Sequence, residues 1–148
     1  MATETEWGNS GPIRQYVFDA HGICAQANGD LLRAARGFPG PGLEEIGEWN
    51  EAAARTAENS LSKLRALPAP EADQALIDDF FSAMEKEIDA LRNTAAAASA
   101  GDRQRVRVLV GKQVDEIHAK DARADDLSAR WRVDDPEILR GCPVSLPG

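Results

Sequence analysis

The apolar positions of this chain recur at three- and four-residue steps in four separate stretches, which is the spacing of one apolar face on an α-helix. The stretches are separated by residues that end helices, namely the glycine- and proline-rich run 37–42, Pro68, Gly101 and Pro136. We therefore expect four helices, at about 12–36, 43–67, 70–100 and 102–133.

The fourth stretch is ambiguous at its start, because Val106, Val108 and Val110 alternate with polar residues as they would in a strand. The longer pattern favours a helix, since apolar residues keep helical spacing over the whole stretch. Its expected apolar face consists of Val106, Leu109, Val110, Val114, Ile117, Ala124, Leu127 and Trp131.

Four helices with short connections predict antiparallel neighbours, and so a single all-α, up-down-up-down four-helix bundle. Alanine, leucine and glutamate are abundant and favour helix, while strand-forming residues are few. We expect residues 1–11 to form a flexible arm that carries Trp7. The tail 134–148 contains Ile138, Leu139, Cys142, Val144 and Leu146, so we expect it to pack back on the first helix.

The formal net charge of the chain is −8 at neutral pH. An acidic surface repels nucleic-acid phosphates, so we expect no nucleic-acid partner. No apolar run approaches the roughly 20 residues that span a bilayer, so we expect no transmembrane segment. Residues 1–11 lack the apolar core of a signal peptide. The expected location is cytoplasmic if Met1 is the native start, and extracytoplasmic if an export segment has been removed.

The two cysteines, Cys24 and Cys142, lie far apart in the sequence. Cys24 is on the apolar face near the middle of the first helix. In an up-down-up-down bundle the fourth helix ends beside the start of the first, and about eight extended residues reach back roughly 25 Å to the level of Cys24. A disulfide there would contribute about 4–5 kcal/mol by chain entropy and would indicate an oxidising compartment. The alternative is two reduced cysteines.

Several short segments, followed by a closing cysteine, resemble a group of small exported helical proteins of actinobacteria, often lipoproteins and largely uncharacterised. The resemblance covers roughly residues 13–142. It implies a disulfide between Cys24 and Cys142 and an extracytoplasmic location, and it implies no reaction. The segments that carry it are Ile23-Cys24-Ala25-Gln26-Ala27-Asn28, Leu64-Arg65-Ala66-Leu67-Pro68-Ala69-Pro70, and Ala95 to Ala100 followed by Gly101-Asp102.

Metal-ligating side chains are sparse, and no Glu-x-x-His pair of the kind found in di-iron bundles occurs. Asp115, His118 and Asp121 follow one another at three-residue steps, so one helix face presents three candidate ligands. His21 is the only other histidine, and by helical rise it differs from His118 in height by about 9 Å. These four residues are weak metal candidates, and solvent-exposed histidines are the simpler interpretation.

Catalytic patterns are also weak. No Gly-x-Ser-x-Gly or phosphate-binding glycine loop occurs. His21 and Cys24 lie three residues apart, which would suit a thiol site, but a buried or bonded cysteine is the simpler interpretation. A basic group opens the fourth helix, where positive charge opposes the helix dipole. Either an anionic partner or solubility accounts for this group, which consists of Arg103, Arg105, Arg107 and Lys112.

Three hypotheses for function remain. The first is a non-enzymatic bundle, monomer or dimer, that binds a protein or cell-envelope partner through the tail or the Trp7 arm. The second is a small-ligand or metal-binding bundle, with a cavity between helices beside the alanine-rich run 95–100 or near Trp49, Phe80 and Met84. The third is an enzyme, for which no active-site signature is present. No cofactor is indicated.

Overall fold

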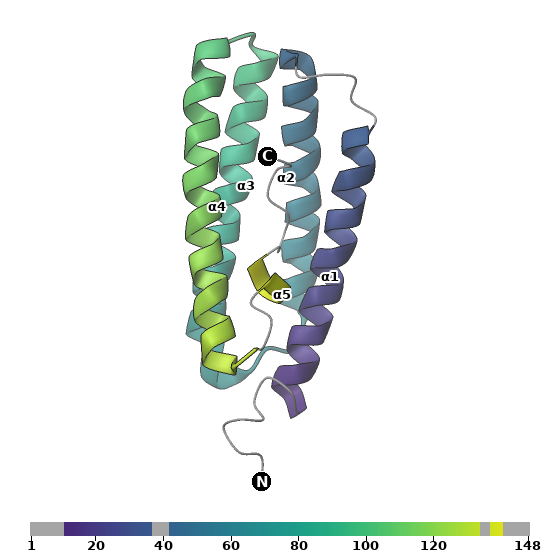
Figure 1. The fold of residues 1–148 in the computed structure, drawn as a ribbon, viewed down its shortest axis with the longest axis vertical. Helices are drawn as coiled ribbons and strands as arrows, with labels where there is room; N and C mark the ends of the chain where they lie inside the picture. Colours follow the sequence, from purple (N-terminus) through teal and green to yellow (C-terminus); the bar gives the residue numbers. More distant parts are fainter. Residues whose placement is uncertain (1–10, 37–41, 134–136, 141–148) are drawn as a thin grey trace.

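The computed structural model describes residues 11–36, 42–133 and 137–140, and it confirms the prediction of an all-α four-helix bundle (Figure 1). No strand occurs in these residues. A 3₁₀ turn, η2 (Glu71–Asp73), precedes the third helix. The helices are α1 (Gly11–Arg36), α2 (Leu43–Ala66), α3 (Gln74–Ser99), α4 (Arg103–Trp131) and the short α5 (Glu137–Arg140).

The four long helices alternate in direction and pack mainly on their neighbours in sequence (Figure 1). Contacts are most extensive between α3 and α4 and between α2 and α3, whereas α1 packs mainly on α2. The short α5 packs on both α4 and α1, and its Leu139 is buried in the core. The expected return of the tail to the first helix is therefore confirmed for α5. The arm with Trp7 and residues 141–148 lie outside the described residues.

The turn between α3 and α4 is built as its sequence predicts. Gly101 has a φ of +75°, a conformation that favours glycine and ends α3. The side chain of Asp102 accepts a hydrogen bond of 3.0 Å from the backbone N–H of Arg105 and caps α4. At its other end α4 stops at Arg132, which has a φ of +54°.

The buried face of α4 differs from the expected one. Val110 and Val114 are 37% and 43% exposed, while Gln113 and Lys120 are fully buried. The reason is that the core side of α4 follows a row at seven-residue steps, in which Gln113 and Lys120 stand between two apolar residues. That row is Val106, Gln113, Lys120 and Leu127.

The main core cluster joins all five helices, including α5, and is filled by residues such as Met84, Leu64 and Trp131. The ring of Trp131 meets that of Tyr16 edge to face at 5.6 Å between centroids, which joins the end of α4 to the start of α1. None of the described helices combines the length and apolar character that a membrane crossing requires.

Candidate functional site

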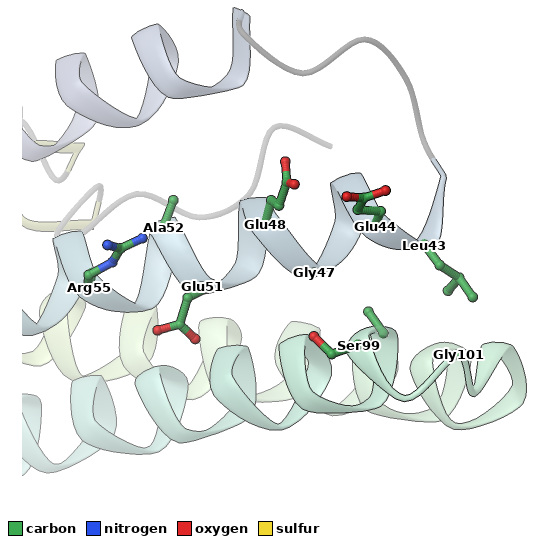
Figure 2. Close-up of a pocket in the computed structure, with 10 residues that line it drawn as sticks. Leu43, Glu44, Gly47, Glu48, Glu51, Ala52, Arg55, Ser99 and Gly101 are labelled. Carbon is green, nitrogen blue, oxygen red and sulfur yellow. The ribbon is translucent and has the colours of Figure 1, made fainter.

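An open groove runs along the outer surface between the first turns of α2 and the last turns of α3 (Figure 2). Its volume is about 730 Å³. Gly47 and Ala98 bring the two helices close together beneath it, since a Cβ added to Gly47 would lie 3.3 Å from the Cβ of Ala98. The alanine-rich end of α3 therefore borders a surface groove, whereas we had expected a cavity between the helices there.

Farther along the same α2–α3 boundary, two ion pairs join the helices. Arg65 pairs with Glu85, and Glu58 pairs with Arg92. Each step from one pair to the next is seven residues backward along α2 and seven forward along α3, as expected for antiparallel helices of equal rise. Continued by one step, the same spacing relates position 51 of α2 to position 99 of α3, where α3 offers a hydroxyl in place of a cation. Ser99 itself lies beside Gly47, with its Oγ 3.8 Å from a Cβ placed on that glycine.

The missing cation leaves the groove acidic. Glu44, Glu48 and Glu51 are exposed along one side of α2, and Arg55 is the only basic residue among the described ones that line the groove. None of the three glutamates forms an ion pair within the described part of the chain. Figure 2 shows Glu51 directed toward α3, on the side where Ser99 lies. The groove therefore presents unpaired carboxylates beside a floor of small residues.

A second charged feature lies inside the bundle, where Lys120 of α4 meets Glu87 of α3. Their Nζ and Oε2 atoms are 2.7 Å apart, and the side chains are 1% and 2% exposed. Burial raises the pKa of Glu87, and the opposite charge of Lys120 partly counteracts this shift. The second carboxylate oxygen, Oε1, has no hydrogen-bond partner among the described residues. The pair is shielded from solvent, so it acts on the packing of α3 against α4.

Another polar contact crosses the core between α2 and α4. Gln113 donates from Nε2 to Asn50 Oδ1 over 2.5 Å, and Asn50 donates from Nδ2 to the carbonyl of Ile46 over 2.7 Å. Both side chains are buried. Asn50 thus uses both its oxygen and its nitrogen, whereas Gln113 uses its nitrogen and its Oε1 has no hydrogen-bond partner among the described residues.

The third buried polar group is at the end of the bundle where η2 meets α4. Asp73 accepts hydrogen bonds from Trp131 Nε1 at 2.7 Å and from Arg130 Nε at 2.9 Å. Burial, with a smaller contribution from the charge of Asp78, raises the pKa of Tyr16, which packs on Trp131, to about 12. These contacts hold the connection between α2 and α3 against α4.

The surface of α4 also holds α5 in place. Arg140 donates from Nε and Nη2 to the two carboxylate oxygens of Asp125, each over 2.7 Å. The hydrogen bonds from Arg140 hold the pKa of Asp125 below its ordinary value. This bidentate pair fixes α5 beside α4.

The weak metal candidates do not form a cluster. His21, His118 and Asp115 are exposed, while Asp121 is partly buried, and burial raises its pKa. Within the part of the chain that the structure describes, no three histidine, cysteine, aspartate or glutamate side chains gather closely enough to hold a metal ion.

Cys24 lies in the core and is 2% exposed, so its thiol is not accessible beside the exposed His21. Cys142, the partner expected for it, lies outside the described residues, so the pairing stays a prediction.

The basic residues at the start of α4 are all exposed. Two of them, Arg105 and Lys112, line a smaller groove of about 280 Å³ between α3 and α4. Val108 lies between them in the sequence and is 57% exposed. None of the basic residues Arg103, Arg105, Arg107 and Lys112 forms an ion pair within the described ranges.

These features define the class of the protein, an all-α bundle whose accessible chemistry is a charged surface with an acidic groove between α2 and α3. The sequence matches no protein-family model, and neither a curated protein nor a solved structure is detectably similar to it.

The groove and the buried pairs were not predicted from the sequence. A signal for the groove was present, because Glu44, Glu51, Glu58 and Arg65 recur every seven residues. Lys120 and Gln113 had a similar signal, since each stands seven residues from an apolar residue of the core row.

Proposed function

We propose that this protein is a non-enzymatic binding module that takes a lysine- or arginine-rich segment of a partner protein into the groove between α2 and α3. The observation that carries the proposal is the incomplete row of ion pairs along this boundary. Two steps are filled by Arg65–Glu85 and Glu58–Arg92. The third step relates Glu51 to Ser99 by the same spacing and lacks a cation on α3.

The chemistry of the groove suits a cationic side chain. Its volume of about 730 Å³ lies in the range of about 300–1,000 Å³ typical of ligand sites. The small residues Gly47 and Ala98 offer an apolar floor for the methylene stem of a lysine or arginine, and the glutamates of α2 offer carboxylates for its head. Exposed ion pairs contribute only about 0.2–1 kcal/mol each, so we expect modest affinity that falls as salt rises.

Calorimetric titration with an alanine–lysine helical peptide tests the proposal, with an alanine–glutamine peptide as the control ligand. We expect binding of the lysine peptide alone. Replacing Glu48 and Glu51 by glutamine should weaken it, whereas Asp79→Asn, at an exposed position near the start of α3, should leave it unchanged.

The variant Ser99→Arg is the sharper test, because an arginine at this position supplies the missing cation from α3 itself. It should pair with Glu51 as Arg92 pairs with Glu58, and so compete with the peptide. Peptide binding that is unaffected by both Ser99→Arg and the glutamate variants would contradict the proposal. The alternative of a small-ligand or metal-binding bundle has no comparable support among the described residues.

We also propose that Cys24 and Cys142 form a disulfide, which would accord with the extracytoplasmic location implied by the resemblance to exported actinobacterial proteins. The support is positional. Leu139 of α5 belongs to the same core cluster as Cys24, and α5 packs on α1. Only one residue separates Arg140, the last of α5, from Cys142, so a short extension of chain starts close to α1.

Peptide mapping under non-reducing conditions tests this pairing. We expect one cross-linked peptide that contains both cysteines and separates on reduction. Two alkylatable thiols in the unfolded, unreduced protein would refute the disulfide and leave the proposal for the groove untouched.

A further inference from the structure

We propose that the groove between α2 and α3 takes the start of α4 from a second copy of this chain, so that the protein forms a symmetric dimer. This inference rests on the proposed function, because it names the cationic segment that the groove binds. The segment is the stripe formed by Arg105, Val108 and Lys112, which we call the basic stripe. All three side chains are exposed.

The basic stripe matches the acidic side of the groove in spacing. Arg105 and Lys112 are seven residues apart on α4, and Glu44 and Glu51 are seven residues apart on α2. Each pair therefore spans about 10 Å along its helix, and each lies on one side of that helix. Two such helices placed side by side bring both basic residues opposite carboxylates at once.

The basic stripe also carries an apolar residue between its charges. Val108 is 57% exposed, although valine side chains are more often buried in proteins. At the same level the floor of the groove consists of small residues, Gly47 and Ala98. A floor without large side chains allows Val108 of the second copy to approach it closely.

The arrangement of the helices allows both contacts to form twice. The acidic groove lies between α2 and α3, and the groove with Arg105 and Lys112 lies between α3 and α4, so the two flank α3 on opposite sides. Both α2 and α4 begin at the same end of the bundle (Figure 1). A two-fold axis that runs parallel to α3 then places each groove opposite the other copy's basic stripe.

The surface of α3 that would face this axis is compatible with close approach. Ala96, in the last turn of α3, and Ala100, just after the helix, are exposed and small. A two-fold contact of this kind uses the same surfaces on both copies and closes as a dimer, without growing into a filament. In the parallel arrangement Glu44 pairs with Arg105 of the second copy, and Glu51 pairs with Lys112 of the second copy.

Neither set of charges is satisfied within one chain. The glutamates of the groove and the basic residues at the start of α4 form no ion pair among the described residues. Asp89 and Glu116 also line the α3–α4 groove near the level of Lys112, but neither forms an ion pair with Lys112 or Arg105 among the described residues. Because the ion pairs between the two copies would form between solvent-exposed side chains, we expect a weak dimer that dissociates as salt rises.

Sedimentation equilibrium over a range of protein concentrations, at low and at high salt, tests the dimer. We expect concentration-dependent dimerisation of the full chain that weakens at high salt. The variant Glu51→Arg places an arginine opposite Lys112 of the second copy. The variant Lys112→Glu places a glutamate opposite Glu51 of the second copy. In both variants, like charges then face each other. Each variant alone should raise the dimer dissociation constant at least about tenfold.

Mixing the two variants gives the decisive result. In a mixed dimer, the arginine introduced at position 51 of one copy faces the glutamate introduced at position 112 of the other, while the native Glu51 and Lys112 face each other at the second contact. We expect the mixture to dimerise about as well as the unmodified protein. The matched control is a mixture of Asp79→Arg and Lys63→Glu, two exposed positions toward the opposite end of the bundle.

The outcomes separate this inference from the proposed function. If the unmodified chain stays monomeric at every concentration while Glu51→Arg loses peptide binding, the dimer is overturned and the proposed binding groove stands. A dimer that the single variants do not weaken, or that mixing does not restore, also overturns the inference. If the lysine peptide does not bind and the chain stays monomeric, both proposals fall.

Discussion

Replacing Lys120 by methionine is expected to destabilise the bundle far more than removing an exposed charge. Lys120 and Glu87 are 1% and 2% exposed, and their Nζ and Oε2 atoms are 2.7 Å apart. Methionine keeps most of the lysine stem, so the main loss is the ammonium group. Leaving one member of a buried ion pair without its partner costs about 3–5 kcal/mol. For a domain of this size that loss lowers Tm by roughly 6–20 °C.

The double variant, with methionine in place of both Glu87 and Lys120, should behave differently. Bringing two charges out of water costs free energy that their attraction only partly offsets, and Oε1 of Glu87 lacks a hydrogen-bond partner among the described residues. Two apolar side chains of similar volume avoid this cost. We expect the double variant to be as stable as the unmodified protein, or more stable by about 1–4 kcal/mol.

Urea denaturation followed by circular dichroism measures the free energy of unfolding of each variant. The control is Arg92→Met, which breaks the exposed pair with Glu58 and should cost less than about 1 kcal/mol. The reasoning would be refuted if Lys120→Met cost no more than this control. It would also be refuted if the double variant lost the sum of the two single losses, because the two residues would then not be coupled.

The stability of the Lys120→Met variant should also depend on pH. Burial raises the pKa of Glu87, and Lys120 is what opposes the shift, so the pKa of Glu87 should rise further in Lys120→Met. A carboxyl whose pKa is higher in the folded state binds more protons there. Its contribution to stability is full below the pKa of the unfolded chain and is lost as pH rises through the folded value. Lys120→Met should therefore be least impaired in acid and lose stability as pH rises.

Three further predictions follow from single contacts. Tyr16 is the only tyrosine, so phenolate absorbance should report its pKa of about 12. Its contribution to stability should be lost as pH rises between about 10 and 12. Titration at an ordinary pKa would contradict its burial. Asp73→Asn weakens its bond with Trp131 and should cost about 1.5–3 kcal/mol in urea denaturation; an unchanged midpoint would contradict this. Arg140→Ala should lower the free energy of unfolding by less than about 1 kcal/mol. The pKa of Asp125, followed by NMR, should nevertheless rise toward its ordinary value. An unshifted pKa would exclude the pair with Arg140 as the cause of the lowered pKa.

The helices were predictable because their boundaries depend on local chemistry. Gly101 and Asp102 end one helix and begin the next through their own backbone and side-chain preferences. The buried face of α4 was not predictable from hydrophobicity alone. Gln113 and Lys120 replace apolar residues in its core row, and their nitrogen atoms bind Asn50 and Glu87 on other helices. The sequence of α4 carries no information about those partners.

The groove depends on a register between helices that no single stretch of sequence specifies. The seven-residue recurrence along α2 is visible in the sequence, but which residue of α3 faces each position depends on the connection between the helices and on the docking of η2 through Asp73. Once one pair is fixed, equal rise along antiparallel helices fixes the others. The row of ion pairs therefore stops where position 99 holds a serine. An arginine there would supply from α3 the cation that we propose a partner supplies. The successive facing positions are Arg65 with Glu85, Glu58 with Arg92, and Glu51 with Ser99.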